Sequence, residues 1–196
     1  MIFLKSQRNA EIRKGRLCKF LNLIFMKKAL FICLLSLITI NLAFSQVEAG
    51  VYYRIIAKHS GKALDVSGGV EGRANGIPVV QYDAVGGANQ FFKFVSVGDG
   101  YYRIIAKHSG KALDVSEGVD GVRNGIPIVQ YDPVGGANQF FKLVSVGDGY
   151  YRIIAKHSGK ALDVSEGVDG VRNGVPIVQY DPVGGANQFF KFVRVN

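Results

Sequence analysis

The stretch HSGKALDVS occurs three times in the chain without a change, beginning at His59, His108 and His157. Each copy holds a histidine, a serine and an aspartate, which are side chains that bind polar ligands, ligate metals or transfer protons. The aspartates are Asp65, Asp114 and Asp163, each with an apolar residue on either side. An aspartate repeated in an unchanged setting indicates one task carried out three times.

Catalysis finds little support among these residues. Asp65 and Asp83 could form a glycosidase-like carboxylate pair, which requires a separation of about 5–9 Å. His59 and Ser60 are neighbours, but nothing supplies the third member of a triad. Three near-identical active sites in one small domain would also be unusual. We therefore expect a protein that is not an enzyme and uses no cofactor.

The histidines raise the possibility of a metal site. Three-fold symmetry could bring His59, His108 and His157 around one axis as a three-histidine zinc site. A histidine in an HSGK turn is more often simply solvated, and we favour that interpretation. No metal site is therefore expected.

These motifs belong to three tandem repeats that each begin with Tyr-Tyr-Arg and recur every 49 residues, at 52–100, 101–149 and 150–196. The first two repeats differ at seven of 49 positions, and the last two differ at four of the 47 that they share. Such similarity predicts three copies of one supersecondary unit.

Each repeat reads as four strands separated by turns. The segments YYRIIAKH, KALDVS, PIVQYD and QFFKFVSV are rich in β-branched and aromatic residues, and Gly-rich or Asn-Gly turns separate them. Three blades are too few to close a propeller, and a solenoid requires distinct capping repeats. A closed three-fold barrel removes the sheet edges. The sequence therefore predicts an all-β fold with pseudo-three-fold symmetry, the β-trefoil.

Alternation along the strands assigns side chains to faces. Leu64 and Val66 share the core face, so Asp65 should point outward, and its loss should leave the core intact. Phe92 should be buried. Phe91, with its counterparts Phe140 and Phe189, should lie on the surface unless a loop covers it.

The first 45 residues are expected to lie outside this fold. Residues 1–25 form a basic leader, and we suspect that the true start is Met26. Residues 26–45 have the positive, apolar and small-residue regions of a secretory signal peptide, which predicts cleavage before Gln46, a domain over 46–196 and no membrane span in the mature protein. Residues 1–45 have a net charge of +7 and 46–196 only +2, which gives little support to nucleic-acid binding.

The motifs YYRIIAKHSGKALDVS, VQYD and GGANQFF, followed by another GDGYYRI, resemble the repeats of ricin-type β-trefoil lectins over the whole of 52–196. The resemblance implies one sugar pocket in each repeat. In that family an aspartate accepts sugar hydroxyls, an aromatic residue stacks on the sugar and an Asn-Gln pair completes the polar contacts. Those positions fall on Asp65, Tyr82, Asn89 and Gln90; on Asp114, Tyr131, Asn138 and Gln139; and on Asp163, Tyr180, Asn187 and Gln188.

The chemistry of these residue types agrees with sugar binding. A carboxylate accepts hydroxyl protons, amides donate and accept, and an aromatic ring covers the apolar face of a sugar. The sequence departs from the family in lacking tryptophan, so the Gln-x-Trp signature becomes Gln90-Phe91-Phe92. Val80 and its counterparts Val129 and Val178 stand where many members have a second glutamine, which puts one sugar contact in doubt.

We therefore expect a secreted, monomeric carbohydrate-binding domain. The resemblance favours galactose-like sugars or plant or bacterial polysaccharides as partners. The alternative is a secreted protein-binding trefoil, such as a protease inhibitor. That function would use the outward phenylalanines and the variable loop at 68–75.

Overall fold

The β-rich segments of each repeat form strands close to the places that the sequence predicts. The computed structural model describes residues 47–196. The strands of repeat 1 are β1 (Tyr52–Ala57), β2 (Ala63–Val66), β3 (Val79–Tyr82) and β4 (Phe92–Gly98). Those of repeat 2 are β5 (Tyr101–Ala106), β6 (Ala112–Val115), β7 (Ile126–Tyr131) and β8 (Phe141–Gly147). Those of repeat 3 are β9 (Tyr150–Ala155), β10 (Ala161–Val164), β11 (Ile177–Tyr180) and β12 (Phe190–Arg194).

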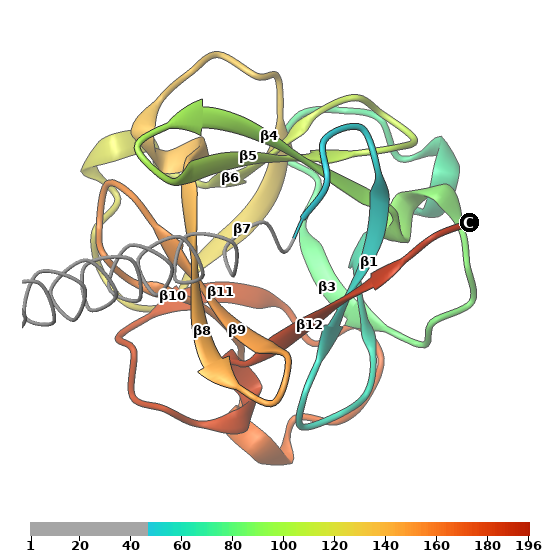
Figure 1. Ribbon diagram of the computed structural model, residues 1–196, viewed down its shortest axis with the longest axis vertical. Helices are drawn as coiled ribbons and strands as arrows, with labels where there is room; N and C mark the ends of the chain where they lie inside the picture. Colours follow the sequence, from blue (N-terminus) through green and yellow to red (C-terminus); the bar gives the residue numbers. More distant parts are fainter. Residues whose placement is uncertain (1–46) are drawn as a thin grey trace, which may run out of the picture. The chain divides into compact units, whose positions relative to one another are not determined.

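Six of these strands close a barrel. Each pairs antiparallel with two others in the cyclic order β1, β4, β5, β8, β9, β12 and back to β1. The closing pair joins the first and last strands, with Tyr53 opposite Arg194. Figure 1 shows β4–β5, β8–β9 and β12–β1 at three positions around the centre of the domain. Closure leaves the barrel without an exposed edge that could pair with another chain.

The other six strands form three hairpins, one in each repeat. The hairpins are β2–β3, β6–β7 and β10–β11. They also join one another, through Val178 opposite Pro127 and through single bridges from Pro78 to Val129 and from Val80 to Pro176. This arrangement is the β-trefoil, so the predicted fold is confirmed.

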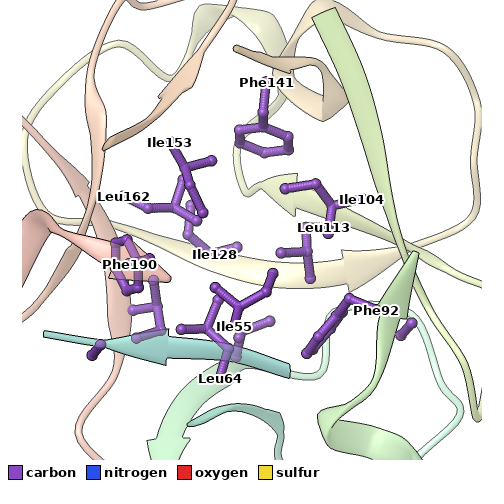
Figure 2. Packing of buried hydrophobic residues seen from close by; sticks show 14 of the residues in the cluster. Ile55, Leu64, Phe92, Ile104, Leu113, Ile128, Phe141, Ile153, Leu162 and Phe190 are labelled. Atoms are coloured by element: carbon purple, nitrogen blue, oxygen red, sulfur yellow. The ribbon is translucent and has the colours of Figure 1, made fainter. Parts of the chain in front are cut away.

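Equivalent side chains from the three repeats fill one core. Each repeat contributes an isoleucine from its first strand, a leucine from its second and a phenylalanine from its fourth, all fully buried: Ile55, Leu64, Phe92, Ile104, Leu113, Phe141, Ile153, Leu162 and Phe190. Figure 2 shows these side chains directed toward a common centre. Burying each one contributes about 1.5–3 kcal/mol, so the core fixes the position of every hairpin.

Two expectations about faces require correction. Leu64 and Val66 are buried as predicted, but Asp65 is only 7% exposed although it lies on the opposite face of β2. Phe91, expected on the surface, is half-buried, and the Lys107 ammonium lies 5.4 Å from its ring centroid. Phe140 and Phe189 are likewise covered, each by an arginine and a lysine. The alkyl stems of such cations shield apolar rings while the charges stay in water.

The expected leader at 1–25 and signal peptide at 26–45 lie outside the described residues. Within 47–196, no helix is long and apolar enough to span a membrane. The only helical elements of that range are six short 3-10 turns, two in each repeat.

Candidate functional site

A cleft lies on the hairpin of each repeat, and it brings together three of the four predicted site residues. Cleft 1 is lined by Asp65, Tyr82 and Asn89, and it has a volume of about 450 Å³. Clefts 2 and 3 each have a volume of about 680 Å³, and they contain the equivalent residues Asp114, Tyr131 and Asn138, and Asp163, Tyr180 and Asn187.

The hairpin itself places the carboxylate. Asp65 on β2 lies opposite Val80 on β3, and both line cleft 1. Burial raises the pKa of Asp65, while hydrogen bonds from Gln90 and Asn89 act in the opposite direction. Asp114 and Asp163 are equally buried, and the pKa of each is raised for the same reason.

Gln90 supports the aspartate from behind. Its Nε2 donates to Oδ2 of Asp65 at 2.8 Å and to the carbonyl of Asp83 at 2.8 Å, while its Oε1 accepts from the Gly86 amide at 3.2 Å. Gln90 is fully buried and does not line the cleft. A direct sugar contact from this glutamine, and from Gln139 and Gln188, stays a prediction, and in the structure both amide hydrogens of each already have partners inside the protein. These glutamines position the aspartates.

Asn89 fixes the turn that carries it. It lies in the 3-10 turn η2 (Ala88–Gln90) rather than in a strand, and its Nδ2 donates to the Val66 carbonyl at 3.1 Å. Gly87 makes room for the amide, because a Cβ at Gly87 would lie 2.4 Å from Oδ1 of Asn89. The same turns recur as η4 (Ala137–Gln139) and η6 (Ala186–Gln188).

The tyrosines form the open side of each cleft. Tyr82 ends β3 and is 42% exposed, and Tyr131 and Tyr180 are each 41% exposed. A half-exposed ring beside a buried carboxylate offers an apolar surface next to a hydrogen-bond acceptor. This pairing suits a ligand with an apolar face and several hydroxyls.

Residues of a neighbouring repeat also line each cleft, and the sequence analysis did not predict this contribution. Gly174 of repeat 3 lines cleft 1, Gly76 and Pro78 of repeat 1 line cleft 2, and Gly125 and Pro127 of repeat 2 line cleft 3. The sequence shows the Asn-Gly turns, but near-identical repeats give no signal for which turn faces which cleft. A single repeat therefore does not build a complete cleft.

Polar contacts hold these turns in place. Gln81 Nε2 donates to the carbonyls of Gly170 and Arg172, at 2.6 and 2.9 Å. Asn173 donates from Nδ2 to Oδ2 of Asp83 at 2.8 Å, and its Oδ1 accepts from the Asp83 amide at 3.0 Å. Gln130 with Asn75 and Gln179 with Asn124 repeat this pattern at the other two contacts between repeats. We call these three sets of contacts the seams.

The histidines belong to the seams. His59 Nε2 lies 3.2 Å from the Gly170 carbonyl, His108 Nε2 lies 3.0 Å from that of Gly72, and His157 Nε2 lies 3.1 Å from that of Gly121. The prediction of solvated turn histidines is therefore wrong. No group of three His, Cys, Asp or Glu side chains in residues 47–196 is arranged to hold a metal ion.

The second carboxylate of the glycosidase-like pair has other partners. Asp83 is exposed and accepts from Lys62 Nζ at 2.5 Å as well as from Asn173. The hydrogen bond from Lys62 is the main cause that lowers the pKa of Asp83. Asp83 does not line cleft 1.

Comparisons with known proteins agree with this fold. A family model described as a ricin-type beta-trefoil lectin domain-like model matches residues 41–131, 119–180 and 137–196. A designed three-fold symmetric protein, ThreeFoil, is 45% identical with a TM-score of 0.69, and the match covers 74% of this chain and 99% of that one. No curated protein gives a significant match.

Two natural proteins are similar as well. An exo-beta-1,3-galactanase from Clostridium thermocellum is 37% identical with a TM-score of 0.69, and the match covers 76% of this chain but only 31% of the galactanase. The ricin B-like lectin of Macrolepiota procera, solved in complex with lactose, is 21% identical with a TM-score of 0.65, over 77% of this chain and all of that one. The lectin shows likeness of fold alone.

Proposed function

The chain belongs to the family of ricin-type β-trefoil lectin-like domains, and from this premise we propose that it is a secreted, non-enzymatic module that binds sugars in three clefts. One observation carries the proposal. In every repeat a buried carboxylate and a half-exposed tyrosine line the same cleft, with an asparagine beside them. Cleft volumes of 450 to 680 Å³ lie within the usual range for small-ligand sites, about 300–1,000 Å³.

The residues have distinct tasks toward a bound sugar. A carboxylate has about four lone-pair positions, so Asp65 keeps acceptor capacity for sugar hydroxyls after it binds Gln90. The Tyr82 ring covers the apolar face of the sugar at little ordering cost. Val80 supplies an apolar wall at the position where many members of the family carry a second glutamine.

The identity of the sugar is argued from the galactanase. Its matching part is 37% identical to this chain, and the whole protein is an exo-beta-1,3-galactanase. We therefore propose galactose-like units of a polysaccharide as the first ligand to test. Secretion rests on the signal-peptide pattern at 26–45.

The competing function, a secreted protein-binding trefoil such as a protease inhibitor, is the weaker candidate. It relied on exposed phenylalanines, but these rings are half-buried, and lysine or arginine cations lie near them. It also relied on the loop at 68–75, part of which lines cleft 1.

A glycan array followed by titration tests the proposal. The array should contain galactosides, plant polysaccharides and bacterial glycans. Calorimetric titration with galactose should then give three sites in the wild type. The Asp65→Asn variant should retain two sites, and the triple variant that also carries Asp114→Asn and Asp163→Asn should retain none.

Asparagine is preferred to alanine because it can still accept from the buried Gln90 amide. Alanine would leave that donor unsatisfied, at a cost of about 1–3 kcal/mol. Asp99→Asn, at an exposed turn residue with φ of 52°, is the matched control and should keep all three sites. Wild-type binding by the triple variant would refute the assignment of the clefts.

A further inference from the structure

The three clefts differ at one edge. Four of the seven differences between repeats 1 and 2 fall in one loop, where Gly68, Glu71, Arg73 and Ala74 become Glu117, Asp120, Val122 and Arg123. Repeat 3 has the same four residues as repeat 2, at Glu166, Asp169, Val171 and Arg172. Gly68, Glu117 and Glu166 each line the cleft of their own repeat. The variation between repeats is therefore concentrated beside the clefts.

The glutamate in this loop has an unfavourable backbone conformation. Glu117 and Glu166 have φ angles of 72° and 71°, and Gly68 has 84°. Glycine adopts this left-handed conformation freely, whereas another residue loses about 1–2 kcal/mol there. Glu117 precedes the turn η3 (Gly118–Asp120), but its side chain makes no capping hydrogen bond to that turn. Glycine serves the backbone as well in repeat 1, so the turn does not require glutamate.

The ion pair of Glu117 does not offset this cost. Glu117 Oε1 accepts from Arg123 Nη2, and Glu166 pairs in the same way with Arg172. The side chains of Glu117 and Arg123 are 46% and 68% exposed. Exposed pairs stabilise a protein by about 0–1 kcal/mol, which is less than the backbone strain. Stability alone therefore does not explain the glutamate.

The position of Glu117 beside the cleft accounts for it better. Glu117 lines cleft 2 together with Asp114 and Tyr131. Its other carboxylate oxygen has no partner in the described part of the chain. That oxygen can accept a hydroxyl proton, and the guanidinium of Arg123 can donate to neighbouring hydroxyl oxygens. An acceptor beside a donor, held together before the ligand arrives, suits the hydroxyls of a second sugar unit.

We propose that Glu117 with Arg123, and Glu166 with Arg172, form a second sugar subsite at the edge of clefts 2 and 3. These clefts then bind two adjoining units of a neutral oligosaccharide, whereas cleft 1 binds one. The larger volumes of clefts 2 and 3, about 680 Å³ against 450 Å³, agree with this assignment. The inference rests on the proposed function, because it extends the same clefts.

Titration with galactose and with β-1,3-galactobiose tests the subsite. Galactose should bind all three clefts with similar affinity. Galactobiose should bind to clefts 2 and 3 at least about tenfold more tightly than galactose does, because hydrogen bonds to charged groups contribute about 1.5–3 kcal/mol. Its third site should have the affinity of galactose.

Exchange of residues between repeats gives matched variants. Glu117→Gly with Glu166→Gly should remove the gain in galactobiose affinity at both tight sites, while galactose should still bind to three sites. This double variant should fold at least as well as wild type, because glycine suits the backbone. Gly68→Glu with Ala74→Arg should give cleft 1 the same gain in affinity for galactobiose over galactose. Glu71→Asp, a natural difference in the same loop, should change nothing.

The outcomes separate the two proposals. A galactobiose gain that is equal at all three sites, absent, or unaffected by the double glycine variant would overturn the subsite while leaving the clefts as sugar sites. If neither sugar binds to any cleft, the proposed function fails and the subsite fails with it.

Discussion

Burial and ion pairing shift the pKa values of two sets of aspartates in opposite directions. Burial raises the pKa of Asp65, Asp114 and Asp163 above the ordinary value of 3.8. The hydrogen bond from a lysine is the main cause that lowers the pKa of Asp83, Asp132 and Asp181 below it. On acidification, the cleft aspartates should therefore gain protons first.

This order predicts how sugar binding responds to pH. Protonation removes acceptor capacity from the cleft carboxylates, so binding should decline on acidification at a pH above 3.8. Between 3.8 and the raised pKa the folded state holds more protons than the unfolded state, so this contribution to stability falls as pH rises through that window. Calorimetry and thermal melts from pH 7 to 3.5 would check both effects. The triple Asp→Asn variant should lose the stability effect, and binding that is constant down to pH 3.8 would contradict the prediction.

The buried glutamines allow a sharper test of positioning. Gln139→Glu replaces an amide that donates to Asp114 at 2.9 Å with a carboxyl group of the same shape. At neutral pH we expect a loss of about 1–3 kcal/mol in the free energy of unfolding, because a buried donor is replaced by a like charge. Cleft 2 should lose its sugar while clefts 1 and 3 keep theirs, as titration would show.

Protonation provides the matched control for this variant. Acidification should restore part of the stability lost by Gln139→Glu, because a protonated carboxyl can donate to Asp114 again. A variant with the stability and the three sites of wild type would show that Gln139 does not position the aspartate.

At the scale of elements, the seams link each hairpin to the turn of another repeat. Asn75 in repeat 1 exchanges hydrogen bonds with Asp132 in repeat 2, at 2.8 and 3.1 Å. The adjoining Gly76 and Pro78 line cleft 2. A substitution in the turn of one repeat should therefore weaken sugar binding in the cleft of the next repeat.

The Asn75→Ala variant tests this connection. We expect weaker sugar binding at cleft 2 with clefts 1 and 3 unchanged, and a stability loss of about 1 kcal/mol because the lost bonds are exposed. Arg73→Ala in the same loop is the control, since the Arg73 side chain bonds only to the carbonyl of Val70 in the described residues. Loss confined to cleft 1, the cleft of its own repeat, would contradict the seam.

The sequence predicts the strands better than it predicts the contacts between segments that are distant in the chain. Alternation in KALDVS places Leu64 and Val66 in the core correctly, because that preference is local. It fails to predict the burial of Asp65, which depends on Gln90 and on the turn η2 folding behind it. It fails at His59 too, whose partner is a carbonyl of repeat 3. Contacts between near-identical repeats cannot be predicted from the local pattern of apolar and polar residues.

At the scale of the whole molecule, near-identity of the repeats affects folding. The pairs β4–β5 and β8–β9 lie within the chain, and β12–β1 joins its ends in a very similar register. Little in the sequence prevents β1 from pairing with β12 of another molecule. We expect refolding at high concentration to yield some domain-swapped dimer, detectable by size-exclusion chromatography with light scattering. A monomer alone under those conditions would refute this.

The seams also bear on how such a chain could be assembled. Each repeat presents a hairpin that accepts a turn and a turn that enters another hairpin, and the last repeat meets the first in the same way. Every seam is thus a head-to-tail contact, and three repeats complete the ring. A peptide of one repeat carries both the hairpin and the turn that form a seam. Three separate copies could therefore form the same three seams as a homotrimer. Covalent linkage adds effective concentration and lets the copies differ, as the loop beside cleft 1 differs from those beside clefts 2 and 3.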